Sequence, residues 1–255
     1  MVKILEEKIT QPSTKITIIA AFAALYIVLS YISPFIPAVG LPEIKINMEA
    51  SFASLFGVIL GPWLGASSAF IGSLGALLLK GANIFDMIFL FNPAFNALIV
   101  GLIVKKKWKV SFVIFTLIIL AFFLTPVCTP LTEHWFVGVL STFDKILALL
   151  IIIPTIILLN RLKTQKNITS ITGYSFIIIF LLAFIGNQAD AALGNTIFAQ
   201  QVVYEGVFQI PLEITRSLFT VSPFIYPIIR IIQTLIAAAA GVPLMRALRR
   251  LEVFD

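Results

Sequence analysis

The sequence has few of the residues that catalysis and metal binding usually need. It contains one cysteine and one histidine, and only 12% of its 255 residues are charged. The single cysteine, Cys128, excludes an internal disulfide and a cysteine metal cluster. The single histidine, His134, excludes two-histidine zinc motifs, and the sequence has no G-x-S-x-G elbow and no Gly-Lys-Ser/Thr phosphate loop. We therefore expect no catalytic residues, no bound metal and no enzymatic activity.

Charge is also too scarce for a soluble domain of this length. Soluble domains carry about a quarter of charged residues, whereas this chain is 60% hydrophobic with a mean hydropathy of +1.06. The chain is therefore predicted to be an integral membrane protein. Its net charge of +6 comes largely from basic residues in short loops, so it indicates membrane topology and not nucleic-acid binding. No small-residue cleavage site follows the first apolar run, so we expect no removable signal peptide.

Eight apolar segments follow one another along the chain. They span residues 16–32, 49–60, 62–80, 86–104, 110–128, 141–160, 174–195 and 224–245. These segments predict an all-α helical bundle in which residues 1–255 form a single transmembrane domain. The bundle has eight passes if every segment crosses, or six passes and a re-entrant hairpin if 49–60 and 62–80 do not.

The stretch from Met48 to Leu79 is interrupted at Gly61-Pro62. A continuous helix of this length would be about 48 Å long at about 1.5 Å per residue, more than a hydrocarbon core of about 30 Å needs. Pro62 lacks an N–H and disfavours helix before it, so we expect two short helices that meet at Gly61. The many small residues after this break indicate either close helix packing alone or the broken segment of a solute site.

The basic residues predict the orientation in the membrane. With eight segments, five of the 18 basic residues fall on one side (Lys45, Lys80, Lys145, Arg216 and Arg230) and the other 13 fall opposite. By the positive-inside rule the basic side is cytoplasmic, with both termini inside. If 49–80 crossed only once, the run Lys105–Lys109 would move outside and the asymmetry would be lost. The outer connections 33–47, 129–140 and 196–223 are long, which suits either a lid or plain solvated loops.

Polar residues inside the apolar segments predict a solute pocket. A charge near the centre of the bilayer costs at least about 2–3 kcal/mol, so such residues usually have a function. They come from three segments and converge toward the outer side: Asn92 and Asn96, Asn187 and Asp190, and Tyr226 and Arg230. Two other interpretations stay open. Each asparagine could make an interhelical hydrogen bond, and Asp190 could pair with Arg230 without binding solute.

Several stretches resemble the substrate-binding S components of energy-coupling factor (ECF) transporters, the vitamin and micronutrient importers of prokaryotes. The resemblance rests on Ala20 and Ala24 in the first segment, the outer run 41–49, the break 61–65 and the closing segment 240–250. Together these stretches cover about half of the chain. The departure is in helix number, because the family core has six helices and this chain has eight segments. We expect the additional pair within 110–160.

The resemblance implies a membrane-embedded substrate-binding subunit of an ATP-driven importer. Such a subunit captures a small vitamin-like micronutrient on the outer face of a prokaryotic plasma membrane and topples to release it. Ala20 and Ala24 would dock on a transmembrane coupling subunit driven by two cytoplasmic ATPases, which use the ATP, so this chain needs no cofactor. Glu43, Lys45 and Asn47 would belong to the lid over the solute.

A different function class remains open from the residues alone. A self-contained secondary transporter would use Asp190 as the carboxylate that couples solute movement to protons or sodium. An S component should copurify with its coupling subunit and ATPases, whereas a solitary carrier should move solute in liposomes with only an ion gradient.

Overall fold

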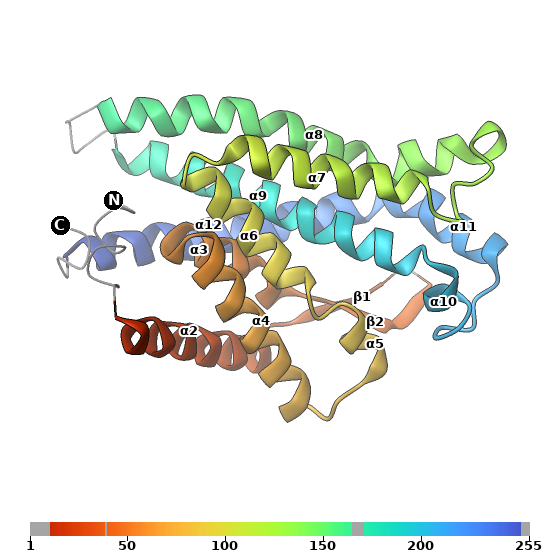
Figure 1. The fold of residues 1–255 in the computed structure, drawn as a ribbon, viewed down its shortest axis with the longest axis horizontal. Coiled ribbons are helices and arrows are strands. Elements are labelled where there is room, and N and C mark those ends of the chain that lie inside the picture. Colours follow the sequence, from red (N-terminus) through yellow and green to blue (C-terminus); the bar gives the residue numbers. More distant parts are fainter. Residues whose placement is uncertain (1–10, 39, 165–170, 251–255) are drawn as a thin grey trace.

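Long helices that run side by side make up most of the structure (Figure 1). The computed structural model describes residues 11–38, 40–164 and 171–250, without the side chains of residues 41–45, 85, 162–175 and 248–250. Within these residues, six stretches are long and apolar enough to cross a membrane: α2 (Pro12–Ile32), α4 (Pro62–Leu79), Asp86–Val104, and most of α8 (Leu131–Thr164), α9 (Ile171–Phe198) and α12 (Tyr226–Arg250). Two shorter apolar helices accompany them, Met48–Leu60 and α7 (Trp108–Phe123). The chain is therefore a multi-pass, largely helical membrane protein.

The predicted break at Gly61 is confirmed. A 3-10 turn, η1 (Met48–Phe52), leads into α3 (Ala53–Leu60), which ends at Gly61 with φ +80°, and Pro62 then begins α4. The small residues bring helix backbones together. A Cβ on Gly65 would lie 2.7 Å from the backbone oxygen of Phe56, and one on Gly101 would lie 2.4 Å from the backbone nitrogen of Pro62. The α3–α4 hairpin is thus packed backbone to backbone, within itself and against α6 (Asn92–Val104).

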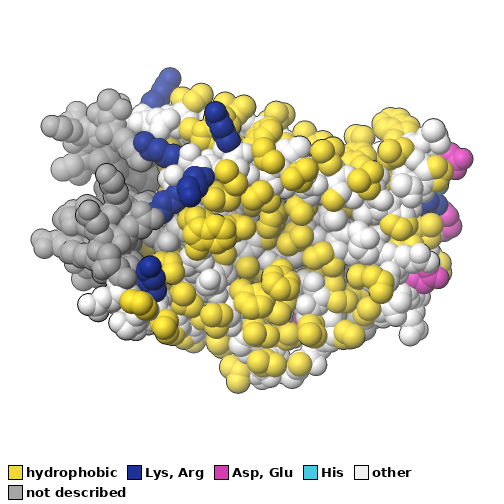
Figure 2. Space-filling view, viewed as in Figure 1, with side chains coloured by type: hydrophobic (Ala, Val, Ile, Leu, Met, Phe, Trp, Pro, Cys, Tyr) yellow, Lys and Arg dark blue, Asp and Glu magenta, His cyan; other side chains and the backbone are white. Residues whose placement is uncertain are grey.

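Charge is separated along the long axis of the bundle. The start of α2 and the end of α12 lie at the same end (Figure 1). Figure 2 shows lysine and arginine side chains near this end and acidic side chains at the opposite end, with hydrophobic side chains between them. The asymmetry counted along the sequence is therefore an asymmetry in space, and we call these the basic and acidic ends. The assignment of the basic end to the cytoplasm stays a prediction.

The connection after α2 is not a plain loop. It forms an antiparallel hairpin of β1 (Phe35–Ala38) and β2 (Leu41–Asn47), with Phe35 opposite Asn47. The turn passes through Gly40 at φ +73°, a conformation that glycine adopts without strain. The hairpin lies toward the acidic end, beside α5 (Ile84–Ile88) (Figure 1).

The two other connections expected to be long loops are partly helical. Helix α8 begins at Leu131, so most of 129–140 is helix and the prediction of a loop there is wrong. A search for apolar segments misses the start of α8 because Glu133 and His134 are polar. An acidic residue in the first turn nevertheless favours a helix. The region 196–223 contains α10 (Gln201–Tyr204) and α11 (Leu212–Val221). Helix α11 continues through η2 (Ser222–Phe224) into α12.

Labelling of single cysteines tests the orientation. The native Cys128 lies buried in the turn after α7, where burial raises the pKa of its thiol to about 11, so we expect it not to react. In intact cells, a membrane-impermeant maleimide should label Glu205→Cys at the acidic end and should not label Lys107→Cys until the membrane is opened. The reverse pattern would contradict the predicted orientation.

Substitution of Gly65 tests the close contact of α3 and α4. We expect Gly65→Val to lower the free energy of unfolding by about 1–3 kcal/mol, because the added side chain must displace backbone. The matched control is Ser67→Val, two residues further along α4 at an exposed position. Thermal unfolding in detergent measures both variants. Equal melting temperatures for the two would show that the contact is not tight.

Candidate solute cavity

A cavity of about 600 Å³ lies between the β1–β2 hairpin, called the hairpin from here on, and the helices that face it. Its size falls within the range of about 300–1,000 Å³ that small-molecule sites usually have. The lining comes from α2, the hairpin, η1, α4, α5, α6, α8, α9, α11, η2 and α12. Polar and charged side chains in this lining include Asn47, Glu49, Lys80, Asp86, Asn92, Lys145, Asp190 and Arg230. A mixed wall of this kind can bind a small polar solute at several points.

Asp190 of α9 and Arg230 of α12 form an ion pair at the cavity wall. Arg230 Nη2 lies 3.6 Å from Asp190 Oδ1, and Arg230 Nη1 donates a hydrogen bond of 2.8 Å to Gln233 Oε1. Gln233 Nε2 in turn donates to the backbone oxygen of Asn47 at 2.9 Å. These contacts connect two long helices with the end of the hairpin, so the ion pair also holds the base of the hairpin in place.

A second ion pair lies within α8. Lys145 Nζ is 2.8 Å from Asp144 Oδ1, and both side chains are almost completely buried. Lys145 lines the cavity, whereas Asp144 does not. A buried pair at this distance is retained because each charge would be costly without the other. The cavity therefore has an ammonium group on one wall with its counter-ion behind it.

Glu49 follows the end of the β1–β2 hairpin and faces Lys80, the residue directly after α4. The Glu49 side chain is almost completely buried in η1, and Lys80 Nζ lies 4.0 Å from its Oε1. Lys80 also donates a hydrogen bond to the backbone oxygen of Ser30, at the end of α2. The ends of α2 and α4 are thus joined at the cavity by one lysine.

Helix α11 and the hairpin turn cover the cavity on its acidic side. A Cβ on Gly40 would lie 2.6 Å from Leu218 Cδ2, so the turn rests directly on α11, and Ala38, Leu218 and Phe219 line the cavity there. The hairpin turn and α11 therefore cover part of the cavity, and we call them its roof.

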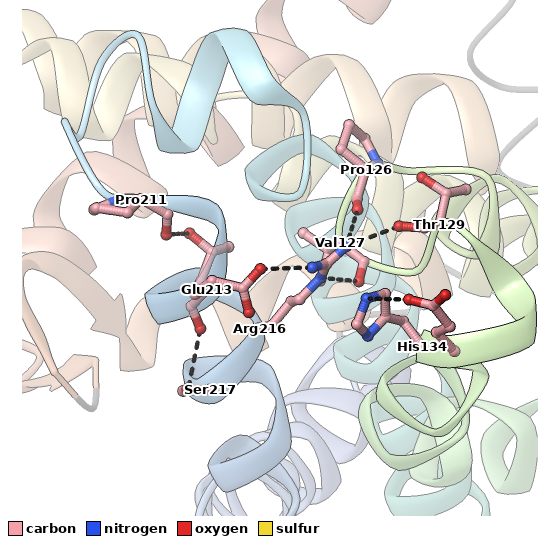
Figure 3. A network of polar contacts seen from close by, with 10 residues as sticks. Pro126, Val127, Thr129, His134, Pro211, Glu213, Arg216 and Ser217 are labelled. Carbon is pink, nitrogen blue, oxygen red and sulfur yellow. Dashed lines mark hydrogen bonds and ion pairs between the residues drawn. The ribbon is translucent and has the colours of Figure 1, made fainter.

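Arg216 fixes α11 to the turn before α8 (Figure 3). Its guanidinium donates to the backbone oxygens of Val127 at 3.1 Å, Pro126 at 3.3 Å and Thr129 at 2.8 Å, and it pairs with Glu213 at 2.8 Å. Three carbonyl acceptors and one carboxylate account for the contacts of this side chain, so Arg216 is a structural anchor for the roof and not a part of the cavity wall.

Asn96 and Asn187 do not line the cavity. They lie on its side toward the basic end, which we call below the cavity. Asn96 Nδ2 donates to Asn187 Oδ1 at 3.1 Å, and Ser54 donates to Asn96 Oδ1 at 2.7 Å. Asn187 Nδ2 donates to Thr234 Oγ1 at 3.2 Å. A Cβ on Gly186 would lie 2.1 Å from Asn96 Oδ1, so only glycine leaves room for this network. It joins α3, α6, α9 and α12, as expected of interhelical hydrogen bonds.

The predicted site residues fall into four groups. Asn47, Asn92, Asp190, Tyr226 and Arg230 line the cavity, whereas Asn96 and Asn187 form the network below it. The side chains of Glu43 and Lys45 lie outside the described residues. Ala20 and Ala24 are exposed on α2, away from the cavity.

Four charged residues of the cavity wall were missed as site residues: Glu49, Lys80, Asp86 and Lys145. Glu49 and Lys145 stand in apolar segments, so the argument from burial cost that selected Asp190 applies to them as well. In the topology argument these charges indicate only the side of the membrane on which they lie, not whether they face a cavity. Lys80 ends its apolar segment, a position where a lysine usually reaches the interface.

Comparisons with known proteins give no relative. No family model matches the chain, and neither a curated protein nor a solved structure matches it. Among the residues that the structure describes, no group of three His, Cys, Asp or Glu side chains could hold a metal ion.

Removal of the Asn96 amide tests the network below the cavity. We expect Asn96→Ala to lower the free energy of unfolding by about 2–4 kcal/mol, because Ser54 and Asn187 each lose a partner in a buried place. Asn195→Ala is the matched control, since Asn195 lines the cavity and is only partly buried. Thermal unfolding of the purified proteins measures the difference. Equal stability of both variants would show that the network contributes little.

Proposed function

We propose that this chain is the substrate-binding subunit of an ATP-driven importer, of the S-component kind that its sequence resembles. The observation that carries the proposal is the roofed cavity near the acidic end, with charged groups of both signs in its wall. A partly covered site of this size suits capture of one small micronutrient from the outer side. In this proposal the β1–β2 hairpin and α11 would serve as the lid that the resemblance implies.

The proposal also accounts for the exposed face of α2. This helix packs on α4 and η1, and it is the least buried of the membrane-length helices. Ala20 and Ala24 lie on its exposed part, one turn apart. Small residues at this spacing let another helix approach closely. We therefore propose that a transmembrane coupling subunit, driven by two cytoplasmic ATPases, docks on this face.

A solitary ion-coupled carrier is the second candidate. The observation that favours it is Asp190, a buried carboxylate in the cavity wall. Copurification and transport assays separate the two. The binding subunit should bring a coupling subunit and ATPases with it and should import solute only with ATP. A carrier should work alone in liposomes with an ion gradient, and Asp190→Asn should then abolish its coupling.

Bulky substitution on α2 tests the docking face. We expect Ala20→Trp and Ala24→Trp to leave retention of the solute unchanged while ATP-dependent uptake is lost, because an indole would hold the partner helix away. Mass spectrometry of the solute retained through purification measures binding, and uptake by whole cells measures transport.

The control for this experiment is Leu117→Trp, at an exposed position of α7. It should retain both binding and uptake. Loss of binding in the α2 variants, or normal uptake by them, would contradict the docking assignment.

A further inference from the structure

Acidic side chains outnumber basic ones among the buried charges around the cavity. Glu49, Asp144 and Asp190 are each 3–4% exposed. Lys145 and Arg230 are the basic groups buried with them, with side chains 5% and 13% exposed. These two bases form the close pairs with Asp144 and Asp190 described above. Within the described side chains, one buried carboxylate is therefore left over, and it is that of Glu49.

Lys80 compensates Glu49 only weakly. Its Nζ is 4.0 Å from Glu49 Oε1, its side chain is 38% exposed, and water screens the pair on that side. The same Nζ donates to the Ser30 backbone oxygen and lies 5.4 Å from the ring centre of Tyr31. Glu49 thus lies in the cavity wall as a carboxyl group that Lys80 compensates only in part.

Aromatic side chains of the wall also favour a positive group. Tyr26 and Phe89 line the same cavity, and aromatic faces attract cations. An ammonium group would supply a counter-charge for Glu49 and a partner for the aromatic rings.

We infer that the solute is an organic cation whose protonated amine binds against Glu49. This inference rests on the proposed function, because it names the class of solute that the same cavity would capture. A carboxylate that binds a ligand can be distinguished from one that stabilises the fold by the effect of neutralising it. Its neutralisation should leave the free protein as stable as before, whereas solute binding should fall.

Three small probes of similar size test the inference: benzylammonium, benzyl alcohol and benzoate. Each is added at the same millimolar concentration to the purified full-length chain at neutral pH, and the melting temperature is measured. We expect benzylammonium to raise the melting temperature and the two others to leave it unchanged. In Glu49→Gln the affinity for benzylammonium should fall at least about tenfold. Glu205→Gln is the control, since Glu205 is exposed and outside the cavity, and it should keep the full shift.

The outcomes separate this inference from the proposed function. No shift with benzylammonium, an equal shift with benzyl alcohol or benzoate, an undiminished shift in Glu49→Gln, or an anionic solute retained through purification would overturn the inference, even if uptake depends on ATP. A shift that depends on Glu49, combined with uptake that needs no ATP, would overturn the proposed function and leave the inference standing. If Glu49→Gln does not fold, the comparison of the three probes on the native chain decides.

Discussion

Charged and polar side chains inside an apolar bundle must find partners within the protein, because the hydrocarbon around it offers none. In this chain the partners come from helices that are distant in sequence. Asp190 on α9 pairs with Arg230 on α12, and Asn96 on α6 joins Asn187 on α9. Each contact fixes the rotation and depth of two helices at once. The polar groups therefore do more than line a cavity, since they set the register of the bundle around it.

The broken α3–α4 hairpin supplies the other half of this arrangement. Gly65 and Gly101 let helix backbones approach to distances that any side chain would prevent. The contacts among α3, α4 and α6 are therefore close. Helix α3 is short. The β1–β2 hairpin that precedes η1 and α3 lies toward the acidic end (Figure 1). Residues of η1 line the cavity, so the short turn between the β1–β2 hairpin and α3 forms part of its wall.

The sequence predicts the parts of this structure that depend on local chemistry. Pro62 fixes the break in the long apolar stretch, and the cost of burying charge selects Asp190 and Arg230 for the cavity wall. The hairpin could not be predicted in the same way, because its pairing and its contact with α11 are long-range. The roles of Asn92 and Asn96 also could not be separated. They lie one turn apart on one helix, and only the packing of α9 decides that Asn96 is covered while Asn92 lines the cavity.

Gln233 connects the roof of the cavity with its charged wall. Its amide accepts from Arg230 and donates to the backbone of Asn47, the last residue of the hairpin. Glu49 follows two residues later, so the base of the lid and the unbalanced carboxylate belong to one short segment. Movement of the hairpin away from α12 would break the bond from Gln233 and displace Glu49 as well. If the proposed function holds, a solute bound at Glu49 would oppose that movement and so couple occupancy of the cavity to the position of the hairpin.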